Sequence, residues 1–195
     1  MGCPCVFSRQ GGCHGGCAAR LRRVVTLLWG CGLVLAASQP LAAGPYGGTD
    51  APLRAAYLIN FIKYVDWPGE AMTATICLYG PDRLGPHLAR HEGSRVRGRS
   101  VHIRRVRRFD PLAGCQVLYV TDADPQRQAA LLEAVARLPV LTVAETPAFV
   151  RCGGAIALLR QDNRMVFAVD AAAIGRAGLR VSPQMLRLAV EGGAR

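Results

Sequence analysis

Apolar and polar residues alternate along the chain with two different periods, which predicts helices and strands in turn. Apolar side chains recur at every third or fourth position in residues 50–67, a spacing typical of a helix with one buried face. Asp50 is the expected N-cap of this helix, and Pro68 is expected to end it. Residues 73–79 are apolar and β-branched and predict a strand, whereas residues 82–91 predict a weaker helical segment.

The arginine-rich segment 94–108 also carries a strand pattern. Val101 and Ile103 are placed on one side of an extended backbone, and His102 and Arg104 on the other. We therefore expect a half-exposed strand, whose charge has two interpretations. The arginines either protect the edge of a sheet from aggregation or form a docking surface for an acidic partner.

The remaining segments continue the alternation of strands and helices. Strands are expected at residues 116–121, 140–143, 155–159 and 165–169, and helices at residues 122–138, from residue 170 and at 182–189. The last two strands are expected to form a β-hairpin around Gln161, Asp162 and Asn163, and Ser182 is the expected N-cap of the final helix. This order predicts an α/β fold: a single domain with a mixed, partly parallel β-sheet flanked by helices in a Rossmann-like sandwich.

The first 43 residues have the features of a Sec-type signal peptide. Three arginines precede an apolar run at residues 24–37, and small residues follow at Ala42 and Ala43. This run is shorter than the roughly 20 apolar residues that a transmembrane helix needs. We therefore expect residues 1–43 to be removed on export and residues 44–195 to form one domain in the periplasm.

Export changes what the charge of the protein implies. The chain has a formal net charge of +11, from 24 basic and 13 acidic residues. Four of the 24 basic residues are in the signal peptide, so 20 basic and 13 acidic residues remain, a charge of +7. Nucleic acid is not an expected partner of an exported protein. The basic residues point instead to an acidic protein surface or to anionic lipid headgroups.

The cysteines divide between the signal peptide and the domain. Five cysteines and a histidine crowd near the N-terminus, but they lie in the signal peptide or before it, so no metal site is predicted there. The domain keeps Cys77, Cys115 and Cys152. Cys77 lies in one predicted strand and Cys115 at the start of another, and neighbouring strands are about 4.8 Å apart, close enough for a disulfide. In an oxidising compartment we expect these two to pair, the alternative being two buried thiols.

No strong catalytic or cofactor-binding motif occurs in the domain, so neither catalysis nor a cofactor is predicted. His87 and His91 are four residues apart, as zinc ligands on a helix would be, but that helix is interrupted and no third ligand is close in sequence. Asp122 and Asp124 follow a predicted strand and precede a predicted helix, where a helix cap is the more common role of an aspartate.

Several segments form a distinctive set. They are AAYLINFIKYVDWP (residues 55–68), ICLYG (76–80), GCQVLYVTD (114–122), PVLTVAETPAFVRCGGAIALL (139–159) and MVFAVDAAAIGRAGLRVSPQMLRLA (165–189). The aromatic helix that ends in Trp-Pro and the closing AGL-x-x-S-x-x-L-x-L-A are the most specific parts. In this set and this order, the chain resembles the YfiR/HmsC-like family of bacterial periplasmic proteins.

The resemblance implies a dimeric periplasmic repressor without catalytic activity. Such a repressor binds the periplasmic sensor domain of an inner-membrane diguanylate cyclase and keeps it inactive. An outer-membrane, peptidoglycan-binding lipoprotein can sequester the repressor, after which cyclic di-GMP rises and a biofilm forms. The resemblance also implies redox-sensitive disulfides. Cys77 and Cys115 match one bridge, and Cys152 matches half of a second bridge whose partner position holds Leu158 or Leu159.

Two hypotheses from different classes follow. The first is a regulator that binds a protein partner, with the candidate contact residues Arg104, Arg105, Arg107, Arg108, Asp170, Leu179 and Arg180. The second is a small-molecule-binding or hydrolytic α/β domain, with Asp122, Asp124 or His87 in a pocket at the carboxyl ends of the strands. A pocket that gathers those three side chains would favour the second hypothesis.

Overall fold

The computed structural model describes residues 50–69 and 71–190 of the 195-residue chain. The predicted signal peptide, residues 1–43, lies outside the described residues. The described residues form one α/β domain with a mixed β-sheet and helices, and this confirms the predicted fold class.

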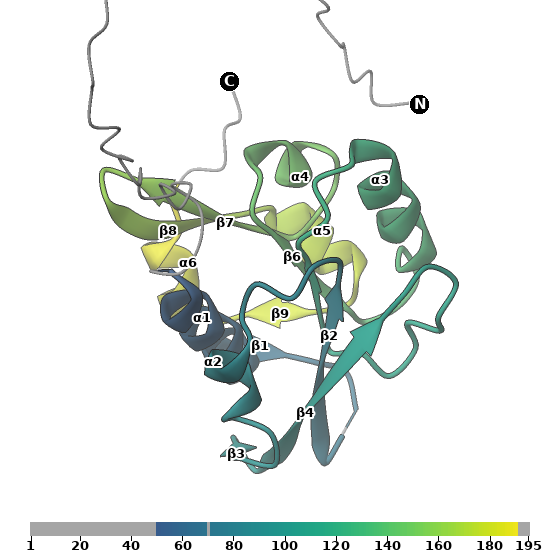
Figure 1. The fold of residues 1–195 in the computed structure, drawn as a ribbon, viewed down its shortest axis with the longest axis vertical. Helices are drawn as coiled ribbons and strands as arrows, with labels where there is room; N and C mark the ends of the chain where they lie inside the picture. Colours follow the sequence, from purple (N-terminus) through teal and green to yellow (C-terminus); the bar gives the residue numbers. More distant parts are fainter. Residues whose placement is uncertain (1–49, 70, 191–195) are drawn as a thin grey trace, which may run out of the picture. The chain divides into compact units, whose positions relative to one another are not determined.

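A seven-stranded mixed sheet forms the centre of the domain (Figure 1). In spatial order its strands are β3 (Arg95–Val96), β4 (Arg99–Val106), β2 (Thr73–Tyr79), β5 (Val117–Val120), β6 (Leu141–Ala144), β7 (Ile156–Gln161) and β8 (Arg164–Val169). The five strands from β4 to β7 are parallel, and β3 and β8 are antiparallel strands at the two edges. The central strands β5 and β6 are buried along their whole length, as expected where helices cover both faces of a parallel sheet.

Helices lie against both faces of this sheet. They are α1 (Ala51–Tyr64), α2 (Pro86–Ala89), α3 (Pro125–Ala134), α4 (Pro147–Arg151), α5 (Ala171–Arg176) and α6 (Pro183–Leu188). Figure 1 shows α1 and α3 on opposite sides of the sheet. After β2 the chain crosses to β4 on one side, whereas β5, β6 and β7 succeed one another on the other side. The carboxyl ends of β2 and β5 therefore form a topological switch point, where open α/β sheets commonly bind ligands.

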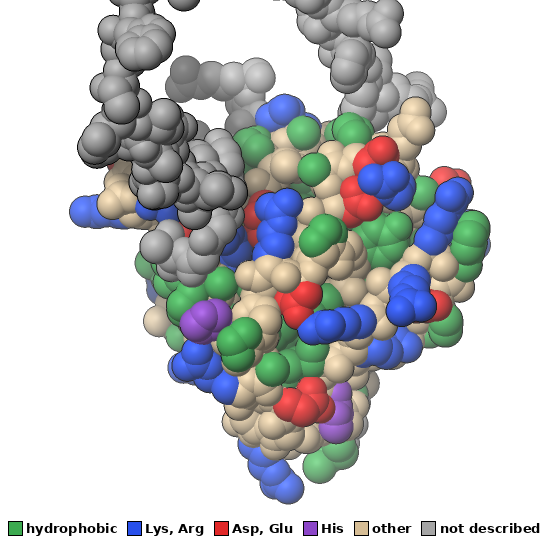
Figure 2. Space-filling view, viewed as in Figure 1, with side chains coloured by type: hydrophobic (Ala, Val, Ile, Leu, Met, Phe, Trp, Pro, Cys, Tyr) green, Lys and Arg blue, Asp and Glu red, His purple; other side chains and the backbone are tan. Residues whose placement is uncertain are grey.

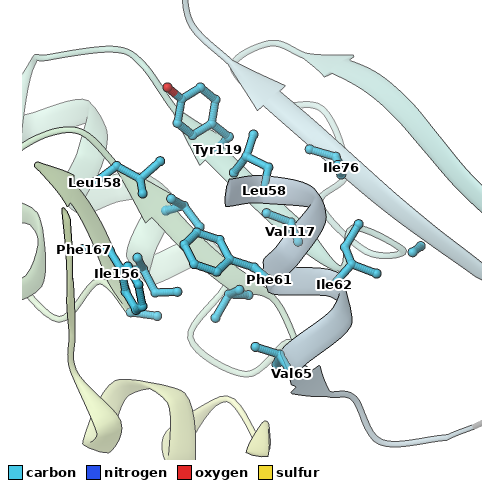
Figure 3. Close-up of a cluster of buried hydrophobic side chains, with 14 of the residues drawn as sticks. Leu58, Phe61, Ile62, Val65, Ile76, Val117, Tyr119, Ile156, Leu158 and Phe167 are labelled. Carbon is cyan, nitrogen blue, oxygen red and sulfur yellow. The ribbon is translucent and has the colours of Figure 1, made fainter. Parts of the chain in front are cut away.

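The larger hydrophobic core lies between α1 and the sheet (Figure 3). Leu58, Phe61 and Ile62 of α1 are at most 2% exposed, because the apolar stripe read from the sequence faces the sheet. The Phe61 ring meets Phe167 of β8 edge-on, with centroids 5.6 Å apart, and Tyr57 lies 6.0 Å away. Burying side chains of this size stabilises the fold by about 1.5–3 kcal/mol each.

A smaller core lies on the opposite face, under α3 and α4. It contains Cys77 and Tyr79 of β2, Leu118 of β5 and Phe149 of α4, together with Cys115 just before β5. The alternation of strand residues between the two faces, Ile76 and Leu78 against Cys77 and Tyr79, puts Cys77 in this second core, and the bridge to Cys77 puts Cys115 there too.

A second, two-stranded sheet was not predicted. Strand β1 (Val65–Asp66) follows α1 and pairs antiparallel with β9 (Arg180–Val181). Just after β1, the buried Trp67 ring donates its Nε1–H to the carbonyl oxygen of Gln116, at 3.1 Å. The aromatic helix and the closing segment, which carry the most specific sequence resemblance, are therefore in contact with each other.

The predicted start and end of the first helix need correction. The helix ends at Tyr64 rather than Trp67, because Val65 adopts extended backbone and pairs with β9. Asp50 occupies the N-cap position, but its side chain makes no capping hydrogen bond. Its carboxylate instead binds Arg160, at 2.7 Å, and approaches Arg54, at 3.8 Å.

Most of the other predicted elements are present, with adjusted ends. The hairpin of β7 and β8 turns at Asp162 and Asn163, whose φ angles of 46° and 63° fit the tight two-residue turns that such hairpins favour. Asp124 and Ser182 cap α3 and α6 through their side chains, as predicted. The weak helix at residues 82–91 is a single turn, α2, and α4 was not predicted.

Candidate partner-binding surface

A disulfide joins the two strands on which the candidate surface is built. Cys77 lies on β2 and Cys115 lies just before β5, and their Cα atoms are 5.8 Å apart. The two residues are 38 positions apart in the sequence, and both are almost fully buried. The bridge therefore fixes the chain that leaves β4 and returns to the sheet at β5, hereafter the basic loop (residues 107–115).

Arg104 stabilises the basic loop through hydrogen bonds to its backbone. It lies opposite Cys77 in the β2–β4 register, and its Nη2 is 3.0 Å from Cys115 Sγ and 3.5 Å from Cys77 Sγ. The same nitrogen donates to the carbonyl oxygens of Pro111 (3.1 Å) and Ala113 (3.4 Å). Arg104 was predicted to contact a partner, but its guanidinium is turned inward against the disulfide. Its role in this geometry is to position the loop.

The tip of the basic loop presents an exposed aromatic ring between charged side chains. Phe109 is 90% exposed and has a φ of 74°, a backbone conformation that costs energy for a bulky residue. The Arg108 guanidinium lies over its ring, 4.8 Å from the centroid. Asp110 accepts a hydrogen bond from the Arg107 backbone N–H at 2.8 Å, which closes the turn. In the described part of the chain, the guanidinium groups of Arg107 and Arg108 form no ion pair.

Arg105 forms an ion pair with the turn at residues 82–85, at the same edge of the sheet. Its guanidinium binds the carboxylate of Asp82, whose other oxygen accepts the backbone N–H groups of Leu84 (3.0 Å) and Gly85 (2.8 Å). The Gly85 hydrogen bond is the largest of the interactions that hold the pKa of Asp82 below its ordinary value; Arg105 also contributes. Arg105 is therefore an exposed cation that is already partly neutralised.

A groove of about 500 Å³ runs between the basic loop and α3. Its floor is apolar and consists of Tyr79, Leu112, Leu131 and Leu138. Figure 2 shows arginine and hydrophobic side chains close together on this side of the domain, on the right of the view. Sequence reasoning missed both Phe109 and this groove, because a single aromatic residue in a loop carries no periodic signal.

The three side chains of the alternative hypothesis do not gather in one pocket: Asp122 and Asp124 both contact Arg127, whereas His87 lies apart from them. Asp122, at the switch point, binds Arg127 through two hydrogen bonds, of 2.6 and 3.0 Å, and this contact lowers the pKa of Asp122 and raises that of Arg127. Asp124 lines the groove, but its side chain caps α3 through the Arg127 backbone N–H. His87 is on α2, which packs against α1 on the opposite face of the sheet, and its Nδ1 lies 2.7 Å from Arg90.

A partly buried polar network lies at the carboxyl ends of β5 and β6. The Tyr119 hydroxyl donates to Glu145, which also pairs with Arg54 of α1 (3.3 Å) and Arg83 (3.5 Å). Burial, reinforced by the negative charge of Glu145, raises the pKa of Tyr119 well above its ordinary value, so this phenol stays protonated. The network links α1 to the sheet.

The candidate residues of the closing segment lie elsewhere in the fold. Asp170 caps α5 by accepting the N–H groups of Ala172 and Ala173, and Leu179 is 4% exposed within the larger core. Arg180 is exposed on β9, opposite Asp66 of β1. Since Leu179 offers almost no surface, it supports this segment from inside.

Arg107 and Arg108 lie at the opposite end of β4 from the β1–β9 pair that carries Arg180. Arg97, in the turn before β4, donates to Asp66 at 2.8 Å, and Asp66 is the register partner of Arg180. Arg107 and Arg108 follow the other end of this eight-residue strand, which spans roughly 26 Å. Arg107 and Arg108 therefore belong to a different surface from Arg180, although all three were predicted to contact the same partner.

The described residues contain neither a metal-binding cluster nor a membrane-spanning helix. In residues 50–69 and 71–190, no group of three or more His, Cys, Asp or Glu side chains is arranged to hold a metal ion. None of the helices in the same ranges has the length and hydrophobicity needed to span a bilayer.

A family model described as YfiR/HmsC-like matches residues 51–190, nearly the whole of the described domain. The chain therefore belongs to the YfiR/HmsC-like family. This is a periplasmic, regulatory family rather than a catalytic one, and it is known for regulators of diguanylate cyclases.

Proposed function

We propose that this member of the YfiR/HmsC-like family is a periplasmic repressor that binds the sensor domain of an inner-membrane diguanylate cyclase and lowers cyclic di-GMP signalling. The observation that carries the proposal is the family match over residues 51–190, which includes every helix and strand of the domain. The predicted signal peptide, residues 1–43, supports the same compartment.

The basic loop is the surface that we assign to partner recognition. Arginine and aromatic side chains supply most of the binding energy in many protein interfaces, and Arg107, Arg108 and Phe109 present both chemistries side by side. Arg105 adds charge at the same edge. The loop is held in place by Arg104 and the disulfide, so little conformational entropy is lost on binding.

Repression requires that the protein bind one conformation of the cyclase more tightly than the other. A ligand with equal affinity for both conformations shifts nothing, and a ratio of about 10⁴ moves an equilibrium from 1:99 to 99:1. We further propose that the protein acts as a homodimer and that an outer-membrane, peptidoglycan-binding lipoprotein releases the cyclase by sequestering it. Biofilm formation would follow the released cyclase activity.

The experiment is deletion of the gene followed by complementation. Deletion is expected to raise cellular cyclic di-GMP and surface attachment, and the wild-type gene is expected to restore both. Complementation with R107E/R108E is expected to fail, because reversed charges repel an acidic partner. The matched control is R137E/R151E, which reverses two exposed arginines outside the basic loop. Unchanged cyclic di-GMP in the deletion strain would refute the proposed function.

A further inference from the structure

The groove between α3 and the basic loop has two chemically different ends. Val106 of β4 and Tyr79 of β2 are register partners at the carboxyl edge of the sheet, so Arg107 and Arg108 begin the loop at that edge. The loop then runs back along the sheet to Cys115, which precedes β5 at the amino edge. The cations therefore lie at one end of the groove, and Leu112 lies toward the other.

Helix α3 gives the facing wall the same polarity. Its first turn carries Arg127 at the carboxyl edge, and Ala130 and Ala134 continue this wall toward the apolar end, where Leu138 of the floor precedes β6. The eight residues from Arg127 to Ala134 span roughly 10 Å of helix. The groove is thus elongated along α3, with a cationic end and an apolar end.

The cationic end has positive charge left for a ligand. Three arginines and two aspartates line the groove: Arg107, Arg108, Arg127, Asp110 and Asp124. Arg127 is neutralised by Asp124 and by Asp122, which lies beside the groove, and Asp110 accepts the Arg107 backbone N–H. The charges of Arg107 and Arg108 therefore exceed the single negative charge of Asp110. Within the described residues the guanidinium groups of Arg107 and Arg108 have no carboxylate partner.

We infer that this groove binds a straight-chain aliphatic carboxylate, that is, a free medium-chain fatty acid. The volume of about 500 Å³ is within the usual range for small-molecule sites, and an apolar floor with a few polar groups at one end is their usual chemistry. The elongated shape favours a chain over a compact ring. Arg107 and Arg108 hold the carboxylate, and the floor from Tyr79 to Leu138 takes the chain. The inference does not rest on the proposed repressor function.

The rim of the site is already formed without a ligand. Arg104 donates to two carbonyl oxygens of the loop, and the Cys77–Cys115 bridge fixes its end. Preorganisation of this kind lowers the entropy lost on binding. The exposed Phe109 ring stands at the cationic end, beside Arg108, where it shields the carboxylate from water.

The test is calorimetric titration of the mature protein with decanoate below its micelle concentration. Saturable binding at one site is expected. R107A/R108A is expected to weaken it about tenfold, the typical effect of losing charge-assisted hydrogen bonds. A134F, which fills the groove from an exposed helical position, is expected to weaken it at least as much. The matched controls are R137A/R151A and A129F, since these exposed residues do not line the groove.

Two comparison ligands test whether the site needs both the carboxylate and the long chain. Decanol has the same chain without the charge, and hexanoate has the charge on a short chain; both are expected to bind more weakly than decanoate. Equal binding of decanol, or decanoate binding that survives both groove variants, would refute the site. Binding to phosphatidylglycerol vesicles without saturable decanoate binding would show instead that the basic loop contacts a membrane surface, and would also refute it.

Discussion

The two faces of the central sheet are stabilised in different ways. On the α1 face, a large apolar core buries Leu58, Phe61 and Ile62 under a regular helix. On the α3 face the core is smaller and contains a covalent bridge between Cys77 and Cys115. The groove and the exposed aromatic ring of the basic loop are both on this second side.

Under the proposed function, this difference separates the part of the domain that supplies most of the burial from the part that binds a partner. A surface that binds other molecules keeps apolar and charged groups exposed, so it contributes less burial to the fold. The α3 face adds a disulfide and the hydrogen bonds of Arg104, which hold the basic loop over this smaller core. The α1 face has the larger hydrophobic core and so makes the larger hydrophobic contribution to stability.

The largest expected effect comes from the core of the α1 face. Phe61→Ala is expected to lower the free energy of unfolding by about 3–5 kcal/mol, because it leaves a cavity among tightly packed aromatic rings. Chemical denaturation of the purified mature protein measures this. Phe109→Ala is the matched control on the other face, and it is expected to change stability by less than about 0.5 kcal/mol. Equal losses for the two variants would contradict the division of roles.

Removal of the disulfide should have the next largest effect. C77A/C115A is expected to destabilise the protein by about 2–4 kcal/mol, since the bridge closes a loop of 38 residues. The same denaturation experiment with and without reductant checks this on the wild-type protein. A variant as stable as the wild type would show that the α3 face does not depend on its bridge.

Arg104→Ala tests the loop more selectively. The loss of its hydrogen bonds to Pro111 and Ala113 is expected to cost about 1–2 kcal/mol and to increase amide exchange mainly in residues 107–115. Hydrogen–deuterium exchange with mass spectrometry measures this region directly. The control is Arg137→Ala, which leaves every contact of the loop intact. Exchange that rises equally across α1 would show that Arg104 stabilises the whole domain rather than the loop.

A smaller effect is expected from acid. The pKa of Asp82 is lowered in the folded protein, so its contribution is present above the ordinary pKa of an aspartate, about 3.9, and is lost as pH falls through the lower folded value. At pH 7, Asp82→Ala is expected to cost about 1 kcal/mol through its lost backbone hydrogen bonds, and this difference should shrink below pH 4. Denaturation at pH 7, 5 and 3 measures it. A difference that grows toward low pH would contradict the assignment.

The sequence predicted the elements of the fold better than their ends. The apolar periods of α1 and of the buried strands were strong enough to place both, and the Asp162–Asn163 turn marked the hairpin. The β1–β9 pair was missed because two residues are too few to show a period, and its formation depends on tertiary contact. For the same reason α1 ends three residues earlier than predicted.

The candidate site was predicted only in part. The spacing of the predicted strands was enough to propose the bridge between Cys77 and Cys115. The contact of Arg104 with the disulfide was not predicted, because a pattern of arginines does not reveal which side chain turns toward the sulfur atoms. The exposed Phe109 and the groove beside it depend on how a loop is folded against α3, which the sequence does not encode as a local signal.

The central claim is that this protein represses a diguanylate cyclase through its basic loop. The most direct measurement is the rate of cyclic di-GMP synthesis by each full-length cyclase of the same genome that has a periplasmic domain, reconstituted in nanodiscs and titrated with the mature protein. We predict saturable inhibition of at least one cyclase, at least tenfold weaker with R107E/R108E and unchanged with R137E/R151E. If no cyclase is inhibited, the claim is wrong, and equal inhibition by both double variants would remove the basic loop from it.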